Sequence, residues 1–334
     1  MTLRVVTRAV RDALAALPPA VRAAPPLVAC SGGPDSLALA AATREVRSDV
    51  RAAVVDHGLQ DGSAAQADAT VELLAGLGVP ATVHPVRVEG SGGLEAAARR
   101  ARYAALTAAR PHPDSPVLLG HTLDDQAETV LLGLGRGSGA RSLAGMRPWR
   151  PPWLRPLLGV RRTATAAACA ELGVTPWSDP HNADPRFTRV RLRREVLPLL
   201  EEVLAGGVAE ALARTAAQLQ EDADVLDELA AELLAEARDG DLLDCAVLAA
   251  RPPALRRRAL RAWLGDRGVS GLTAEHLAAA DRLVTARRDG SGAALPGGCE
   301  LARTHGRLDV LPIGWPAGGQ VLRRPREVRH RVRR

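Results

Sequence analysis

Short apolar runs alternate with longer amphipathic segments from residue 26 onward. The apolar runs fall at 27–30, 52–55, 81–86 and 117–120, and the amphipathic segments fall between and after them at 37–46, 67–77, 95–109 and 123–134. Alternation of this kind is typical of parallel strands joined by crossover helices. The pattern therefore predicts an α/β fold over about residues 20–200, with a doubly wound, mostly parallel sheet.

A different pattern follows the glycine pair at 206–207. Leucines recur every seven residues at 212, 219, 226 and 233, which predicts one long amphipathic helix over 208–238 that ends near Gly240. Further helices are expected after Pro252 and from about 273 to 287, followed by short strands within 293–311. We expect an α/β domain at 1–205, a mainly helical domain at 206–320 and a basic tail at 321–334.

Length and composition fit a globular chain of about two domains. The 334 residues are 46% hydrophobic and 25% charged, and no apolar stretch approaches the ~18–20 residues that a membrane-spanning helix needs. Arginines at positions 4, 8 and 11 stand where a signal peptide would place its apolar segment. We therefore expect a cytoplasmic protein without a membrane partner.

Charge is concentrated in two places. Residues 321–334 hold seven arginines and one glutamate, which accounts for the whole formal net charge of +6. Between 136 and 162 there are seven arginines and no acidic residue, together with Trp149 and Trp153. Both segments suit contact with RNA. The alternatives are a solvated tail in the first case, and tryptophans that fill the core beside surface arginines in the second.

A strand, a glycine-rich turn and a helix start follow one another directly at 27–37. The turn has the sequence Ser31-Gly32-Gly33-Pro34-Asp35-Ser36. Glycines allow backbone amides to approach a phosphate, and a helix N-terminus adds partial positive charge, so the turn predicts an anion cradle. Because a carboxylate would repel the anion, we expect Asp35 to hold Mg²⁺ that bridges to the phosphates. The alternative is a glycine-rich turn capped by Asp35.

Two further polar clusters follow predicted strands. Asp56 and His57 end the second strand, and the fourth strand leads into His121 and a helix that carries Asp124, Asp125 and Glu128. Carboxyl ends of parallel strands meet at one edge of a sheet, where open α/β folds bind ligands. Helix capping by Thr122 or Asp124 is the alternative, and it explains one acidic residue but not three.

A basic segment lies near the end of the α/β region. It follows the run at 179–184 that contains Asn182, and it includes Arg189, Arg191 and Arg193. Guanidinium groups neutralise phosphate charge and stay protonated, so these arginines are candidates for phosphate or RNA contact, as is Arg136. The alternative is a solvated helix face.

These motifs together resemble a known family. The turn SGGPDS resembles the pyrophosphatase loop of N-type ATP pyrophosphatases, which cleave ATP between the α and β phosphates. With VDHGL, EAAARRARY, HTLDDQAET, GRGSG, DPHNAD and RVRLRREVLP, the chain resembles the tRNA(Ile)-lysidine synthetases over about residues 26–200. Val190 departs from the family pattern, which often has asparagine there.

The resemblance implies a function. The family joins lysine to C2 of the wobble cytidine of an isoleucine tRNA with a CAU anticodon, through an adenylated cytidine. It implies that 1–205 is the catalytic domain and 206–320 contacts tRNA, with ATP as substrate and Mg²⁺ as cofactor.

The resemblance also implies residue roles. ATP binding would fall to Ser31, Gly32, Gly33, Pro34, Asp35, Ser36, Asp56 and His57. Catalysis would involve Asp35, His121 and Asp125, with Asp35 on the metal. Lysine contacts would be Asp124, Asp125, Glu128 and Asn182, and phosphate or tRNA contacts would be Arg136, Arg189, Arg191 and Arg193.

Other functions share the adenylation chemistry. A tRNA 2-thiolase would need paired cysteines for a cluster, and the four cysteines at 30, 169, 245 and 299 form no CxxC pair. A GMP or NAD synthetase would leave the basic segments and the C-terminal region without a purpose, and a catalytically silent module would not need Asp35 and His121. The oligomeric state stays open, a homodimer included.

Overall fold

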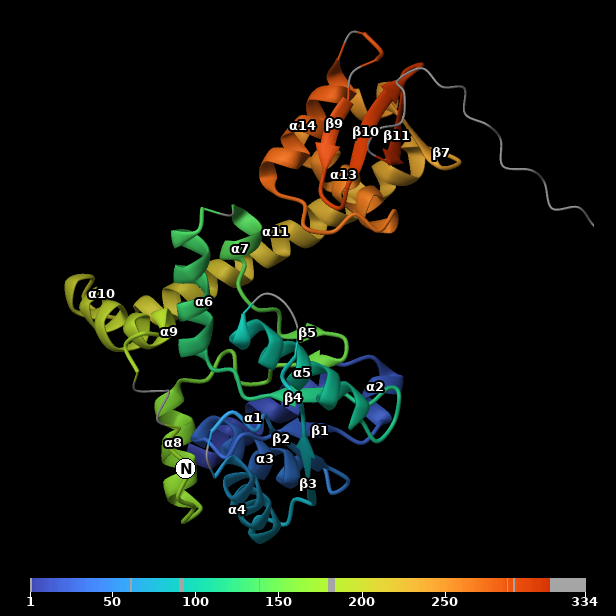
Figure 1. The fold of residues 1–334 in the computed structure, drawn as a ribbon. Helices are drawn as coiled ribbons and strands as arrows, with labels where there is room; N and C mark the ends of the chain where they lie inside the picture. The colour runs from blue at the N-terminus through green and yellow to red at the C-terminus, as the bar shows by residue number, and fades with distance from the viewer. Residues whose placement is uncertain are drawn as a thin grey trace, which may run out of the picture. The chain divides into compact units, whose positions relative to one another are not determined.

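The structure is a computed structural model, and it describes residues 2–60, 62–89, 93–137, 139–179, 184–286, 288–290 and 292–312. Figure 1 follows the chain. Its contacts group into two units, Met1–Gln220 and Glu221–Arg334. The division falls inside one long helix, α11 (Val208–Ala237). The domain boundary at 205 stays a prediction, and the basic tail at 321–334 lies outside the described residues.

The first unit is built around a six-stranded sheet. Its strands are β1 (Leu27–Ala29), β2 (Arg51–Asp56), β3 (Ala81–Pro85), β4 (Val117–Leu119), β5 (Trp149–Arg150) and β6 (Trp153–Leu154). They are ordered β3-β2-β1-β4-β6-β5, and every neighbouring pair is parallel except β5 with β6. The predicted α/β fold with a mostly parallel sheet is confirmed.

Helices cover both faces of this sheet. They are α1 (Thr2–Ala15), α2 (Pro19–Ala23), α3 (Pro34–Val46), α4 (Ser63–Gly76), α5 (Leu94–Ala108) and α8 (Arg162–Glu171). Val28 of β1 belongs to the core that α1, α3, α4 and α8 build on one face, whereas Leu27 and Ala29 belong to the core that α5 builds on the other. Alternate residues of β1 therefore point to opposite layers, as a doubly wound sheet requires.

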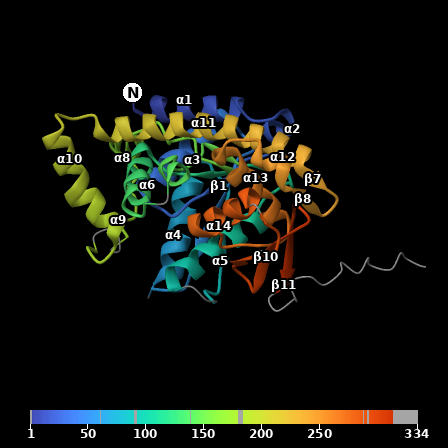
Figure 2. The same ribbon diagram turned by 90° about the horizontal axis from the view of Figure 1, so that it is seen from above.

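The helix α1 was not anticipated from the sequence. It packs on α3 and α8 (Figures 1 and 2) and buries Leu3, Val6, Val10 and Leu14. The remaining helical segments of this unit are α6 (Leu123–Gly135), α7 (Ala140–Leu143), α9 (Thr188–Arg191), the π-helical turn η2 (Leu192–Val196), α10 (Leu197–Val203) and the first part of α11.

The winding of the sheet reverses between β1 and β4. These strands pair in register from Leu27 with Val117 to Ala29 with Leu119, although β2 and β3 lie between them in the sequence. The crevice outside the carboxyl ends of two such strands is where open α/β sheets bind ligands. Gly120, directly after β4, lets the backbone pass close to Asp35, because a Cβ at this position would lie 3.1 Å from the backbone carbonyl of Asp35.

The second unit combines helices with a small antiparallel sheet. Its strands are β7 (Arg238–Asp239), β8 (Leu242–Asp244), β9 (Gly292–Leu295), β10 (Cys299–Thr304) and β11 (Arg307–Pro312), in the order β7-β8-β11-β10-β9. Its helices are the rest of α11, α12 (Cys245–Ala249), α13 (Pro253–Asp266) and α14 (Ala274–Thr285). Trp263 is buried in its core.

This unit follows the sequence pattern closely. Figure 2 shows α11 as one uninterrupted helix, as the leucine repeat predicts. The helices expected after Pro252 and from about 273 are α13 and α14, and the strands expected within 293–311 are β9, β10 and β11. The helical character of the C-terminal region is confirmed.

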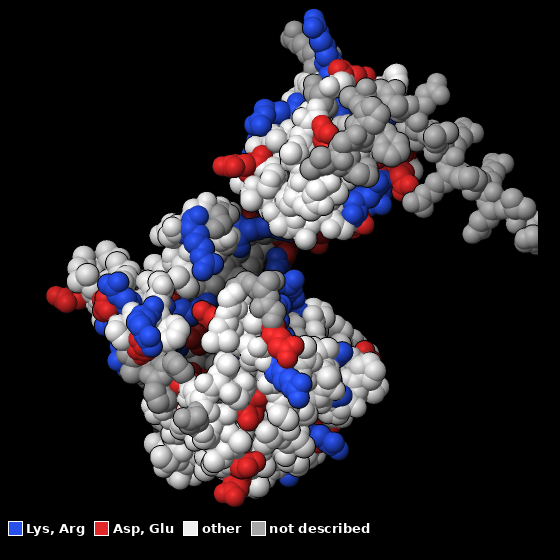
Figure 3. Space-filling model, viewed as in Figure 1, with Lys and Arg blue, Asp and Glu red and all other residues white. Residues whose placement is uncertain are grey.

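Two features bear on the expected contact with RNA, namely the distribution of charge on the surface and the positions of Trp149 and Trp153. Figure 3 shows acidic and basic side chains interspersed over the described surface of each unit in this view. Trp149 and Trp153 pack against the two cores of the first sheet, and the Trp153 ring lies 4.4 Å from that of Tyr103. Both side chains are half-buried, as the core alternative predicts, and RNA contact by this segment stays a prediction. Among the described helices, none has the length and apolar character to cross a bilayer.

Candidate active site

The turn at 31–36 is folded around the side chain of Ser36. Its buried hydroxyl accepts the Ser31 amide at 3.1 Å and donates to the Gly33 carbonyl at 2.9 Å. Gly33 is the N-cap of α3 and provides no side-chain hydrogen bond, so no capping side chain serves the first-turn amides of that helix. Amides in this position attract an anion.

Gly32 cannot be replaced without strain. Its φ is +79°, in the left-handed region, and a Cβ would lie 2.5 Å from the Thr70 hydroxyl oxygen. The Gly32 carbonyl accepts the Trp177 amide at 2.9 Å. The turn is therefore fixed between α4 on one side and the segment around Trp177 on the other.

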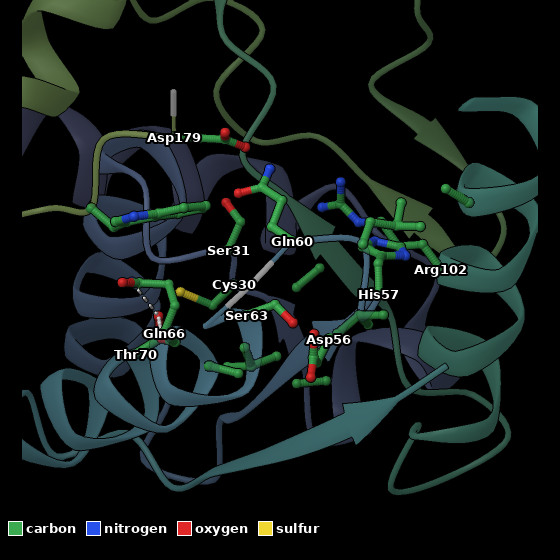
Figure 4. Close-up of a pocket in the computed structure, with 18 of the residues that line it drawn as sticks. Cys30, Ser31, Asp56, His57, Gln60, Ser63, Gln66, Thr70, Arg102 and Asp179 are labelled. Carbon is green, nitrogen blue, oxygen red and sulfur yellow. Dashed lines mark hydrogen bonds between the residues drawn. The ribbon is translucent and has the colours of Figure 1, made fainter. Parts of the chain in front are cut away.

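A cavity of about 970 Å³ opens beside Ser31. Its polar lining comprises Glu95 and the ten residues labelled in Figure 4: Cys30, Ser31, Asp56, His57, Gln60, Ser63, Gln66, Thr70, Arg102 and Asp179. Leu94, Leu106, Trp177 and Phe187 add apolar walls. A large, mostly apolar cavity with a few polar groups is typical of a small-molecule site. The structure brings Ser31, Asp56 and His57 together here.

His57 and Arg102 lie together at one end of this cavity. They lie side by side in Figure 4. Burial lowers the pKa of His57, and Arg102 lowers it further against the opposing effect of Asp56. The Nδ1 atom of His57 is buried without a hydrogen-bond partner among the described residues, which leaves it available to a ligand. Arg102 was missed by the sequence analysis, although the spacing of Arg99 and Arg102 places both on one face of α5.

A separate cluster of charges lies around the start of α6. Carboxylates and guanidinium groups pair there: Asp35, Asp124, Asp125 and Glu128 with Arg161, Arg162, Arg189 and Arg193. Arg161 also pairs with Glu201 and Glu210. A small cavity of about 130 Å³ opens among them. The sequence analysis placed Arg161 and Arg162 in a segment suited to RNA, and the structure places them in this cluster.

Asp35 faces this cluster from the first turn of α3. Its Oδ1 accepts a short hydrogen bond from the Thr165 hydroxyl, and its Oδ2 lies 3.5 Å from Arg162 Nε. Burial raises the pKa of Asp35, and Thr165 and Arg162 oppose that shift. Its carboxylate is thus poorly solvated and gains from a cation nearby.

Asp125 combines helix capping with a charge contact. Its Oδ2 accepts the Thr122 amide at 2.8 Å and the Thr122 hydroxyl at 2.9 Å, which completes a capping box. Capping at Thr122 is therefore confirmed, but Asp125 Oδ1 lies 2.6 Å from Arg162 Nη2. Burial alone would raise the pKa of Asp125, but Arg162 and the Thr122 amide outweigh burial and lower it.

Asp124 and Glu128 are also engaged. Asp124 Oδ2 accepts the backbone amide of Arg162 at 2.7 Å, at the first residue of α8. Glu128 is fully buried and is paired with Arg193 at 2.8 Å, while Arg189 lies 3.8 Å away. Glu128 and Arg193, assigned to lysine and to phosphate by the resemblance, therefore contact each other here.

The other predicted contacts are more exposed. Arg191 pairs with Glu195 at 2.9 Å, and Arg136 is exposed at the end of α6. Asn182 lies outside the described residues.

His121 stands between the end of β4 and the charge cluster. Burial lowers the pKa of His121 to about 4; Asp125 opposes the shift, and Arg155, Arg102 and Arg99 add to it. The ring is therefore neutral near pH 7. Its buried Nδ1 has no hydrogen-bond partner among the described residues, so a substrate group can use it.

Comparisons with known proteins show which sequence families the chain matches. A model of the PP-loop domain matches residues 6–200, and a model of the TilS substrate binding domain matches residues 243–308. A tRNA(Ile)-lysidine synthase from Mycolicibacterium paratuberculosis is 62% identical over 293 residues, which cover 86% of this chain and 89% of that protein. One from Nocardia farcinica is 60% identical over 289 residues, covering 85% of this chain and 90% of the relative.

One solved structure supports the fold alone. The U34-tRNA thiolase NcsA from Methanococcus maripaludis, solved with its [4Fe-4S] cluster, aligns with a TM-score of 0.54 at 18% identity. The alignment covers 66% of this chain and 80% of the thiolase.

Gly32 and Gly33 provide a matched pair of substitutions. We expect Gly32→Ala to lower the free energy of unfolding by about 1–2 kcal/mol or more, because the backbone is left-handed and the new Cβ meets Thr70. Gly33→Ala meets nothing closer than 3.7 Å and has negative φ, so we expect a change within about 0.5 kcal/mol. Urea unfolding measures both, and equal losses would refute this account of the turn.

His121 makes the stability of the folded protein depend on pH. The unfolded chain takes up a proton on this ring near pH 6.5, whereas the folded protein resists it until about pH 4. The contribution of the neutral His121 ring to the free energy of unfolding is therefore complete above pH 6.5 and is lost progressively as pH falls towards 4. We expect His121→Asn to lose less stability than the wild type between pH 7 and pH 5 in urea unfolding. Identical pH profiles would contradict the assignment.

Proposed function

Because the chain belongs to the tRNA(Ile)-lysidine synthase family, we propose that its turn at 31–36 holds ATP and that the acidic residues of α6 receive lysine. Family membership makes the chain an ATP-dependent ligase that modifies isoleucine tRNA at its wobble cytidine. One observation carries the assignment of roles: the turn at 31–36 lies next to both a nucleoside-sized cavity and a charge cluster. The cavity would take the adenosine, and the cluster would take lysine.

The first step activates the base. The O2 oxygen of the cytidine attacks the α-phosphorus of ATP, and the bond from that phosphorus to the β-bridging oxygen breaks. Pyrophosphate leaves with the bonding electrons. The first-turn amides of α3 and the turn at 31–36 stabilise the charge that develops on this leaving group.

The second step joins lysine to the base. The ε-amine attacks C2, the C2–O2 bond breaks, and AMP leaves with the oxygen. The ammonium group of lysine must first lose a proton, and Asp125 would orient it. That proton would pass to solvent, because a ring with a pKa of about 4 is a weak acceptor, and the neutral ring of His121, with Nδ1 unpaired, would bind the cytosine.

Magnesium fits this site through Asp35. No three His, Cys, Asp or Glu side chains among the described residues are grouped to hold a metal by themselves. Mg²⁺ on a nucleotide takes most ligands from phosphates and water and needs one or two carboxylates. Asp35 offers one, half-buried beside the proposed phosphate cradle. When bound there, the ion would neutralise charge on the phosphates.

The tRNA has contacts of two kinds in this proposal. Arg136, Arg189 and Arg191 stand at or near the surface and would neutralise backbone phosphates. The second unit matches the TilS substrate binding domain and would hold more of the tRNA. The cytidine must leave its stack to reach ATP. We place the reaction in the cytoplasm, where ATP, lysine and tRNA occur together.

Labelled lysine tests the function directly. With ATP, Mg²⁺ and a CAU-anticodon isoleucine tRNA, we expect one lysine incorporated for each pyrophosphate released. A transcript with uridine in place of the wobble cytidine should accept none. Absence of incorporation by a folded preparation would refute the assignment.

Asp35→Asn tests the proposed metal residue in the same assay. The neutral amide cannot hold the cation, so we expect incorporation to fall about 100-fold or more while the fold is retained. Asp12→Asn, an exposed change on α1, serves as the control and should keep the wild-type rate. A normal rate for Asp35→Asn would remove Asp35 from this role.

A further inference from the structure

The guanidinium group of Arg162 reaches three carboxylates at once. Its Nη2 lies 2.6 Å from Asp125 Oδ1, its Nε 3.5 Å from Asp35 Oδ2 and its Nη1 3.5 Å from Glu128 Oε1. Burial opposes its charge, but Asp125, Glu128 and Asp35 outweigh burial and raise the pKa of Arg162. A permanent cation therefore occupies the place where the proposed function needs two others, magnesium and the lysine ammonium.

The backbone of Arg162 is fixed, and only its side chain is free to move. Its amide donates to Asp124 Oδ2 at 2.7 Å, and its carbonyl lies 2.7 Å from the Thr165 hydroxyl oxygen, whose one proton it shares with Asp35 Oδ1. Both bonds hold the first turn of α8 in place. Any rearrangement of the cluster would therefore be a swing of the guanidinium group about a fixed Cα.

Asp125 has one oxygen to offer. Its Oδ2 is saturated by the Thr122 amide and hydroxyl. Its Oδ1 is held by Arg162, and Arg193 is the next cation, at 3.5 Å. A lysine ammonium that uses Asp125 must therefore compete with Arg162 for a single oxygen.

The phosphate cradle lies next to this guanidinium group. Arg162 Nε already reaches Asp35, which stands in the first turn of α3 beside the uncapped amides. Guanidinium binds phosphate oxygens in a bidentate way and at least as well as it binds a carboxylate. A triphosphate in the cradle would thus offer Arg162 a second set of partners within reach of the same side chain.

We propose that Arg162 is a resident counter-ion that occupies Asp125 until ATP binds, so that lysine binds after ATP. The triphosphate draws the guanidinium group away, and Asp125 Oδ1 becomes available to the lysine ammonium. This inference rests on the proposed function, because it takes Asp125 as a lysine contact. Before ATP arrives, lysine would have to displace a paired cation from a partly buried carboxylate, which is costly.

Calorimetry of lysine binding tests this order. L-lysine is titrated into the full-length protein alone and into protein saturated with α,β-methylene-ATP, whose carbon bridge cannot be cleaved. We expect the wild type to bind lysine about tenfold or more tightly in the presence of the analogue. In Arg162→Gln, whose saturation by the analogue is checked separately, the affinity of the analogue-free protein should rise and the two values should agree within about threefold.

The neighbouring arginine is the matched control. Arg161 pairs with Asp124, Glu201 and Glu210 and contacts neither Asp35 nor Asp125. Arg161→Gln frees Asp124 and changes the lysine affinity in both states alike, so the ratio of the affinities with and without the analogue should stay as in the wild type. Thermal unfolding of each variant shows whether the fold is retained.

Three results would overturn the inference: equal lysine affinity of the wild type with and without the analogue, unchanged coupling in Arg162→Gln, or no lysine binding in either state. If labelled lysine is still incorporated into tRNA, the proposed function stands and the inference alone fails. If incorporation is also absent, the proposed function fails with it.

Discussion

Charge balance around the start of α6 is the constraint on which the site depends. Four carboxylates with restricted access to water lie beside the turn that we propose as the triphosphate site, and unpaired they would destabilise the fold and repel such a ligand. The guanidinium groups of Arg161, Arg162, Arg189 and Arg193 pair with them, and Arg161 also pairs with Glu201 and Glu210. Because each of these carboxylates already has an arginine partner, we expect a cationic substrate that binds one of them to compete with that arginine.

The fold brings this cluster to the phosphate turn. Reversal of the winding between β1 and β4 makes their carboxyl ends neighbours, and Gly120 allows the backbone after β4 to approach Asp35 closely. α8 then delivers Arg162 from a third segment, with its first turn capped by Asp124 of α6. Three segments far apart in the sequence thus meet at one end of the sheet. The family match accounts for the reaction, and this convergence is the reason for which we propose that the reaction occurs at this end of the sheet.

Sequence patterns predicted the fold and the positions of the main motifs. Strong alternation at 27–134 and the leucine repeat of α11 located these elements because local periodicity survives in the tertiary structure. The polar clusters at the strand ends were located because they directly follow the predicted strands. The helix α1 was missed because the arginines at 4, 8 and 11 were interpreted only as evidence against a signal peptide, and the apolar residues between them were not.

Which arginine pairs with which carboxylate could not be predicted from the sequence. Nothing local distinguishes Arg162, which contacts three carboxylates, from exposed Arg136, and both stand in one arginine-rich stretch. Glu128 and Arg193 are 65 positions apart, and their pairing depends on how η2 packs against α6. Such contacts belong to tertiary packing, and a single sequence does not record them.

The position of the triphosphate tests the central claim most directly. A crystal structure of the protein with α,β-methylene-ATP and Mg²⁺ should show the adenosine in the cavity lined by Asp56 and His57, and the phosphates against the amides of 31–36. Phosphates bound elsewhere, with that turn empty, would contradict the account.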